Sequence, residues 1–74
     1  MSNRKTAYEL TILSAREIEV LQLSAEGYSN KQTAAKLYIT DDTIDKHNRK
    51  IVSKLMANNM KQAVAIGIRK NLII

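Results

Sequence analysis

The sequence predicts a small all-α domain built from four helices. Three segments begin with residues that cap helix N-termini, and apolar residues recur at helical spacing after each of them. The 74 residues contain no Pro and only two Gly, so few residues interrupt these segments. No segment has the pattern of a strand, and no internal repeat is present. The length allows one domain with a single aliphatic core.

The first predicted helix covers about residues 14–25. Ser14 and Glu17 have the spacing of a capping box, in which the hydroxyl accepts the Glu17 amide and the carboxylate reaches back to the Ser14 amide. Gly27 follows where a helix end favours a left-handed residue, so we expect the helix to end there. Residues 1–9 are expected to form a flexible N-terminal segment, and residues 10–74 the folded domain.

The second predicted helix is short and covers about residues 30–37, with Ser29 and Gln32 repeating the capping pattern. A short helix, a turn of about three residues and a longer helix together form the helix-turn-helix arrangement. Small side chains suit the crossing of the two helices, and an apolar plug fills the angle between them. These positions hold Ala34, Ala35, Ile39 and Ile44. Other small helical bundles also have alanines near a turn, so these residues alone leave that alternative open.

The third predicted helix covers about residues 41–56 and begins after the Thr40 cap. Asp41 and Asp42 lie in its first turn, where the free amides and the helix dipole favour negative charge. At about 100° per residue, the helix has two distinct faces. The inner face holds Ile44, His47, Ile51 and Leu55. The outer face holds Asp42, Asp45, Lys46, Arg49 and Ser53.

The fourth predicted helix covers about residues 60–70, after a break at Asn58 and Asn59. Its apolar residues spread over roughly 200° of the helix surface, wider than the stripe of about 100° that packing against one core requires. A second copy of the domain is the natural cover for the excess. The expected dimerisation residues are Met60, Val64, Gly67 and Ile68. The alternative is a helix that packs more deeply into its own core.

The charge balance indicates a polyanionic partner. Twelve Lys and Arg against seven Asp and Glu give a net charge of +5, which favours nucleic acid or an anionic membrane surface. No apolar run approaches the roughly 20 residues of a spanning helix, so we expect no membrane and a cytoplasmic location. With no Cys and a lone His47, we expect no metal and no cofactor. So short a chain has little room for an enclosed active site, so we expect no enzyme.

Two stretches of the chain carry a resemblance to a known family. The stretch LSAREIEVL at 13–21 resembles the family opening L-T-x-R-E-x-E-V-L, and AEGYSNKQTA at 25–34 resembles A-x-G-x-S-N-K-E-I-A. Further matches are Thr43, Ile44, His47, Ile51, Lys54, Leu55, Gln62, Ala63 and Val64. Over about residues 10–73 the chain is similar to the LuxR/GerE-type helix-turn-helix domain of bacterial transcription regulators.

This resemblance implies a fold of four helices, in which the third helix enters the major groove of double-stranded DNA. It also implies a homodimer on DNA, formed through the fourth helix, and it is compatible with a contact to RNA polymerase. Family members usually carry this module behind a phosphorylated receiver or a small-molecule sensor, although some consist of the module alone.

Three residues depart from the family pattern. Thr33 stands where relatives prefer an aliphatic residue, and Met60 replaces a usual Arg. Asp45 stands where Lys is frequent and contacts DNA in relatives, so that contact is not carried over unchanged. Asp45 and Met60 motivate the alternative function, a helical protein-interaction module that has lost DNA binding.

The outer face of the third helix supplies the expected base contacts, Asp45, Lys46 and Arg49. Lys46 and Arg49 can donate to guanine O6 and N7, Arg49 with two bonds. Asp45 can accept from cytosine N4, or it can pair with Arg49 one turn later and hold the guanidinium in one orientation. His47 falls on the inner face and is expected to belong to the framework.

Phosphate contacts are expected from the start of the second helix and from residues beside the outer face. These residues are Ser29, Asn30, Lys31, Thr43, Lys50 and Lys54. Lys31 lies beside the free amides of a helix N-terminus, which bind anions and fix register without reading sequence. For each Lys the alternative is a solvated surface charge, which is the favoured one for Lys31, Lys36 and Lys61. For Thr43 the alternative is to shield the start of the third helix.

Overall fold

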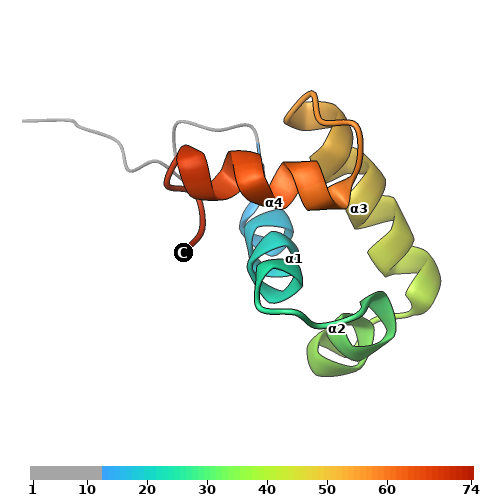
Figure 1. The fold of residues 1–74 in the computed structure, drawn as a ribbon. Coiled ribbons are helices and arrows are strands. Elements are labelled where there is room, and N and C mark those ends of the chain that lie inside the picture. Colours follow the sequence, from blue (N-terminus) through green and yellow to red (C-terminus); the bar gives the residue numbers. More distant parts are fainter. Residues whose placement is uncertain (1–12) are drawn as a thin grey trace, which may run out of the picture.

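The fold is a bundle of four short helices. The computed structural model describes residues 13–74, and the expected flexible segment 1–9 lies outside them. The helices are α1 (Ala15–Ala25), α2 (Asn30–Leu37), α3 (Asp41–Lys54) and α4 (Met60–Arg69), as Figure 1 shows. Residues 13–74 contain no strand, so the predicted all-α class is confirmed. None of these helices is long and apolar enough to cross a membrane.

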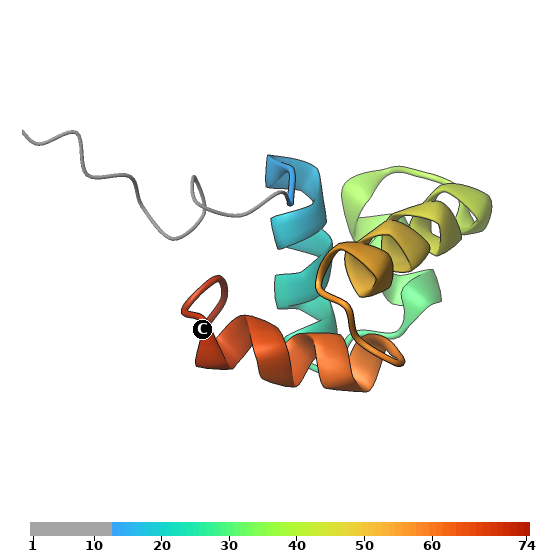
Figure 2. The same ribbon diagram turned by 90° about the horizontal axis from the view of Figure 1, so that it is seen from above.

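α1 packs against each of the other three helices. α2 and α3 lie together to one side of α1, and α4 runs across it (Figure 2). α3 also contacts both α2 and α4, so three helices hold it along its inner side. This packing fixes which face of α3 is turned away from the domain.

α1 and α2 begin with the predicted capping boxes. The Oγ of Ser14 accepts the Glu17 amide at 3.1 Å, and the Ser14 amide donates to Glu17 Oε1 at 2.8 Å. Ser29 and Gln32 form the same pair of bonds at 3.1 and 2.9 Å. The caps of α3 and α4 are Thr40 and Asn59. These side chains satisfy amides that have no partner within their own helix.

Left-handed residues follow the C-termini of the helices. Gly27 follows α1 with a φ of 98°, which glycine adopts without a steric penalty, and this ending was predicted. Tyr38, Met56 and Asn71 follow the other helices with φ of 58°, 55° and 60°. This conformation costs a residue with a Cβ about 1–2 kcal/mol. Because the backbone turns left-handed at Met56, α3 ends at Lys54, two residues before its predicted end.

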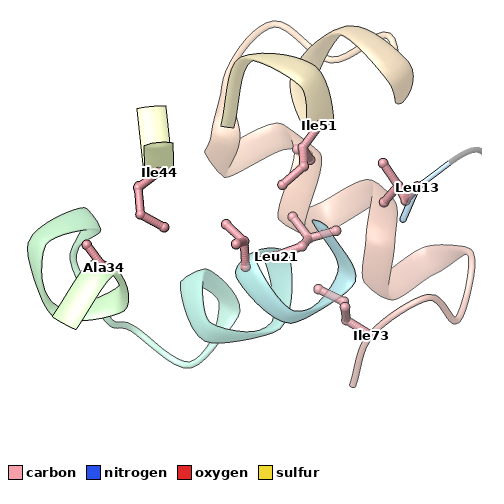
Figure 3. Packing of buried hydrophobic residues seen from close by; sticks show 8 residues of the cluster. Leu13, Leu21, Ala34, Ile44, Ile51 and Ile73 are labelled. Carbon is pink, nitrogen blue, oxygen red and sulfur yellow. The ribbon is translucent and has the colours of Figure 1, made fainter. Parts of the chain in front are cut away.

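Leu21 of α1 lies at the centre of the hydrophobic core and is fully buried. Figure 3 shows Ile44 and Ile51 of α3 on one side of it and Ile73 on another. The buried apolar residues are Leu13, Val20, Leu21, Ala34, Ile44, Ile51, Ala63 and Ile73. Ala34 and Ile44 thus fill the predicted angle between α2 and α3. Ala35 is exposed, so its predicted place in the crossing is wrong, because successive helical residues point about 100° apart.

Candidate nucleic-acid interface

α3 presents a polar face to solvent on the side opposite the core. Its inner side carries Ile44, Asn48 and Ile51, all of them buried. The exposed outer residues are Asp42, Lys46, Arg49, Lys50 and Ser53, with Asp45 half-buried beside them. The outer positions agree with the predicted outer face. On the inner face His47 and Leu55 are half-buried, and Asn48, which was assigned to neither face, is buried. Because the core does not require the outer side chains, they are available to a partner.

Asp45 and Arg49 form an ion pair on this outer face. The Nη2 of Arg49 donates to Oδ2 of Asp45, one helical turn earlier. The side chains remain 76% and 51% exposed for Arg49 and Asp45, respectively. A guanidinium has five N–H donors in a fixed fork, so a bond to one nitrogen restricts its direction and leaves other donors available.

A shallow, open depression bordered by basic residues lies on the outer side of α3. Its volume is about 350 Å³, and it is lined by Arg49, Lys50, Ser53 and Lys54. Lys46 lies one turn before Lys50, so basic residues follow one another along the C-terminal part of the helix. Arg49 is paired with Asp45 and Lys54 with Glu17, so Lys50 is the lining cation without a carboxylate partner among the described residues. This part of α3 therefore suits the oxygens of a polyanion.

Lys54 makes a contact that the sequence analysis did not predict. Its Nζ lies 2.9 Å from Oε1 and 3.2 Å from Oε2 of Glu17 in α1. Glu17 is only 3% exposed. Burial alone would raise the pKa of its carboxyl. The Ser14 amide and the Lys54 ammonium together lower this pKa by more than burial raises it, so it lies below its usual value. Lys54 thus joins α3 to α1, because a buried carboxylate requires a compensating partner. Its side chain stays 31% exposed, and its expected phosphate contact stays a prediction.

The N-terminus of α2 presents hydrogen-bond donors to solvent. Asn30 and Lys31 are exposed, and within residues 13–74 their backbone amides have no protein acceptor. The Ser29 oxygen already accepts the Gln32 amide, which leaves the hydroxyl proton for another acceptor. The residues expected to contact phosphate from α2 therefore lie together at the end of the helix that attracts anions.

Two side-chain contacts fix the region where α2 meets α3. The hydroxyls of Thr40 and Thr43 lie 3.0 Å apart, so Thr43 takes part in the cap of α3. The Nδ2 of Asn48 donates to Oδ1 of Asn30 at 2.9 Å. Asn48 thereby connects the inner side of α3 to the first residue of α2.

α4 turns most of its expected dimerisation residues toward its own domain. Gly67 is buried, and a Cβ there would lie 2.9 Å from Leu21 Cδ2 and 3.2 Å from Ile73 Cγ1. The half-buried residues that pack against the same core are Met60 and Val64. Ile68 remains 49% exposed. The expected place of Gly67 in a dimer contact is wrong, because its lack of a side chain makes room for Leu21 and Ile73 of the same chain.

The sequence of this four-helix domain matches a known protein family. The family described as bacterial regulatory proteins, luxR family, matches residues 11–66, which is most of the chain. The chain belongs to the luxR family. It is a LuxR-type helix-turn-helix DNA-binding domain of a transcription regulator, as its resemblance to that family implied.

Relatives of this LuxR-type domain include both a whole regulator and solved structures. The oxygen regulatory protein NreC of Staphylococcus aureus (strain JH9) is 37% identical over an aligned length of 75 residues, and the match covers 97% of this chain and 35% of NreC. The structure of the transcription factor GerE has a TM-score of 0.81 at 26% identity, and the match covers 95% of this chain and 97% of GerE. The structure of the response regulator ChrA of a heme-sensing two-component system has a TM-score of 0.80 at 40% identity, and the match covers 97% of this chain and 33% of ChrA.

The chain thus spans about a third of the length of NreC and of ChrA.

The sequence analysis missed the contacts of three residues in this LuxR-type domain. Asn48 was not assigned a role, although it lies at helical spacing between buried residues of α3. Glu17 was recognised as a cap, but its partner Lys54 lies 37 positions away, and no local pattern indicates that pair. Lys36 was expected to be a solvated charge, but its Nζ lies 4.8 Å from the centroid of the Tyr28 ring, a cation–π distance.

Proposed function

We propose that this LuxR-type domain binds double-stranded DNA in a sequence-specific manner, with α3 in the major groove. The observation that carries the proposal is the outer face of α3, where Lys46, Arg49 and Lys50 are exposed and the core requires none of them. A major groove about 12 Å wide admits one α-helix with its side chains. The acidic first turn stabilises the start of the helix, and the basic residues follow where DNA would lie.

Base recognition is assigned to Lys46 and Arg49. Either residue can donate to guanine O6 and N7, and a bidentate Arg contact discriminates against a wrong base by about 1–3 kcal/mol. The ion pair with Asp45 supports this role for Arg49, because it restricts the directions in which the guanidinium can point. The Asp45 carboxylate also repels sites that offer it no hydrogen-bond donor.

Phosphate contacts are assigned to the start of α2 and to Lys50. The exposed side chains of Asn30 and Lys31, with the free amides beside them, suit one phosphate at the helix N-terminus. The hydroxyl of Ser29, the N-cap of α2, is a further donor there, and Thr43 is assigned to phosphate from the first turn of α3. These contacts set the position of α3 along the duplex without reading its sequence.

We infer that the domain binds DNA as a homodimer through the part of α4 that its own core leaves uncovered. Ile68 of α4 is 49% exposed, and Ile74, beyond the end of the helix, is 97% exposed. A two-fold dimer would bind two half-sites about one turn of the duplex apart. In a bacterial cytoplasm, such a dimer beside a promoter can contact RNA polymerase. NreC is named as an oxygen regulatory protein and ChrA as a response regulator of a heme-sensing system, and both are about three times as long as this chain. We therefore infer that a whole protein with this domain couples a signal to DNA binding.

Selection of bound sequences from a pool of random duplexes tests this function. A DNA-binding domain enriches a motif, and its affinity falls steeply with salt because phosphate contacts release counterions. Arg49→Ala should lower affinity for the selected site by about 1–3 kcal/mol and relax the preference at one base pair. Lys31→Ala is the matched control and should weaken all sequences alike, lowering the salt slope by about one.

Absence of an enriched motif and of salt dependence would contradict the proposal. That outcome would favour the alternative function, a helical protein-interaction module.

A further inference from the structure

Asn48 is a buried polar residue between α2 and α3. It is only 8% exposed, and it lies on the inner face of α3 with Ile44 and Ile51. Its Nδ2 donates to Asn30 Oδ1 at 2.9 Å. Its Oδ1 is buried and has no hydrogen-bond partner among the described residues. A buried acceptor without a partner lowers stability, so Asn48 is a costly residue at an apolar position.

An apolar residue of similar shape would avoid this cost. Asn and Leu both branch at Cγ, and the neighbouring inner positions of α3 are aliphatic. Residues that contradict the local rules of stability are concentrated at functional sites. The single bond that Asn48 makes indicates which function it serves, because that bond ends on a residue of the proposed DNA interface.

The bond from Asn48 determines how the Asn30 amide is oriented. Asn30 is the first residue of α2 and is exposed. Because its Oδ1 accepts from Asn48, its Nδ2 is turned away from the core, and no described residue accepts from this nitrogen. The outward group is therefore a donor, beside the free amides of Asn30 and Lys31. Without the bond, the amide could rotate and present its oxygen to a phosphate, which would repel it.

We propose that Asn48 is a positioning residue for DNA binding, acting through Asn30. It holds the Asn30 carbonyl inward so that the Asn30 Nδ2 donates to a phosphate oxygen at the N-terminus of α2. This inference rests on the proposed function and adds a residue that does not touch DNA. The contact is neutral, so it adds affinity without adding to the number of counterions released.

The salt dependence of binding separates this role from those of the charged residues. Loss of Lys31 removes a positive charge and should lower the slope of log K against log salt by about one. Loss of the Asn48–Asn30 bond should shift the whole line to lower affinity and leave its slope unchanged. Because a phosphate carries no sequence information, the shift should be equal on the selected site and on a random duplex.

The experiment measures unfolding and DNA affinity for Asn48→Leu, Asn30→Ala and the double variant. Asn48→Leu should unfold at the same denaturant concentration as the unmodified chain or at a higher one, since it removes the unsatisfied acceptor. Its affinity for DNA should nevertheless fall about tenfold at every salt concentration, the effect of one hydrogen bond to a charged oxygen. Asn30→Ala should cause a similar loss, and the double variant should lose no more than either single variant.

Asn48→Ala removes the amide without adding volume and takes the place of Asn48→Leu if leucine prevents folding. A folded Asn48 variant with unchanged affinity overturns the inference, and so does a double variant whose losses add. If the unmodified chain itself shows no salt-dependent binding, the proposed function fails and this inference fails with it. Binding by the unmodified chain together with a null result at Asn48 overturns this inference alone.

Discussion

Arg49 of α3 donates from Nη2 to Oδ2 of Asp45, one turn nearer the start of the same helix. Both side chains are more than half exposed, so the pair contributes only a few tenths of a kcal/mol to folding. The ion pair matters more for the proposed recognition of DNA than for folding. The carboxylate lowers the positive charge of the outer face and restricts the guanidinium that we assign to a guanine.

We expect Asp45→Lys to raise non-specific affinity and to reduce specificity. The change replaces a negative charge by a positive one on the outer face, so binding to any duplex should strengthen and the salt slope should become steeper. Arg49 would also lose the bond that restricts its direction, so the ratio of specific to non-specific binding should fall. Titrations of the selected site and of a random duplex at two salt concentrations measure this ratio.

Asp45→Asn is the matched control, because it removes the charge and nearly keeps the size of the side chain. It should lower the ratio with a smaller gain in non-specific affinity. A ratio that rises in Asp45→Lys would mean that Asp45 impairs recognition, and it would favour the protein-interaction alternative.

Glu17 should make stability depend on pH in the acidic range. Its carboxyl pKa is lowered from 4.5 in the folded protein, despite burial, by the Ser14 amide and the Lys54 ammonium. The unfolded chain therefore binds this proton at a higher pH than the folded chain does. The stability that Glu17 contributes is complete above pH 4.5 and is lost as the pH falls through the lower folded-state pKa.

Denaturant unfolding between pH 7 and pH 3 measures this dependence. Glu17→Gln should flatten the acidic part of the curve, whereas Glu19→Gln, at an exposed position of the same helix, should leave it almost unchanged. An equal acid dependence in the Glu17→Gln variant would show that other carboxyls cause it.

Lys54 should contribute to stability more than to DNA binding. Lys54→Met leaves the buried Glu17 carboxylate without its cation, and we expect a loss of about 1–2 kcal/mol, less than for a fully buried pair because Lys54 is partly exposed. The salt slope of DNA binding should change little. Lys50→Met is the matched control on the outer face and should lower the slope by about one while stability is retained. If Lys54→Met lowers the slope as Lys50→Met does, Lys54 contacts phosphate after all.

The starts of the helices could be predicted because each depends on a local sequence pattern. A capping box spans four residues, so Ser14 with Glu17 and Ser29 with Gln32 were visible in the sequence and formed as predicted. The faces of α3 followed from helical spacing for the same reason. The far end of α3 was less accurate, because nothing local indicates that Met56 becomes left-handed.

Contacts between distant segments were not predictable in this way. The apolar residues of α4 predicted excess surface for a second copy, but the pattern of one helix does not reveal that the C-terminal tail folds back onto it. Ile73 packs against Gly67, and the Gln22 side chain bonds to both the amide and the carbonyl of Ile74, at 2.9 and 3.1 Å. The tail thus covers part of the surface that the sequence analysis assigned to a dimer.

Ile68 is the expected dimerisation residue that remains exposed, so it provides the sharpest test of a dimer. Ile68→Asp places a charge where the monomer leaves it hydrated, so folding should change by less than about 1 kcal/mol. In the proposed dimer the same charge would be buried without a partner. We therefore expect binding to two half-sites one duplex turn apart to weaken at least tenfold, while binding to one half-site is retained.

Gly67→Val provides the contrast at the neighbouring position. Its added carbons would meet Leu21 and Ile73 in the core, so this variant should lose about 1–3 kcal/mol of stability. Gel-shift titrations on duplexes with one and with two half-sites, together with thermal unfolding, separate these effects. Equal losses on both duplexes for a folded Ile68→Asp variant would show that α4 does not form the dimer contact, and that a second copy, if it binds, uses another surface.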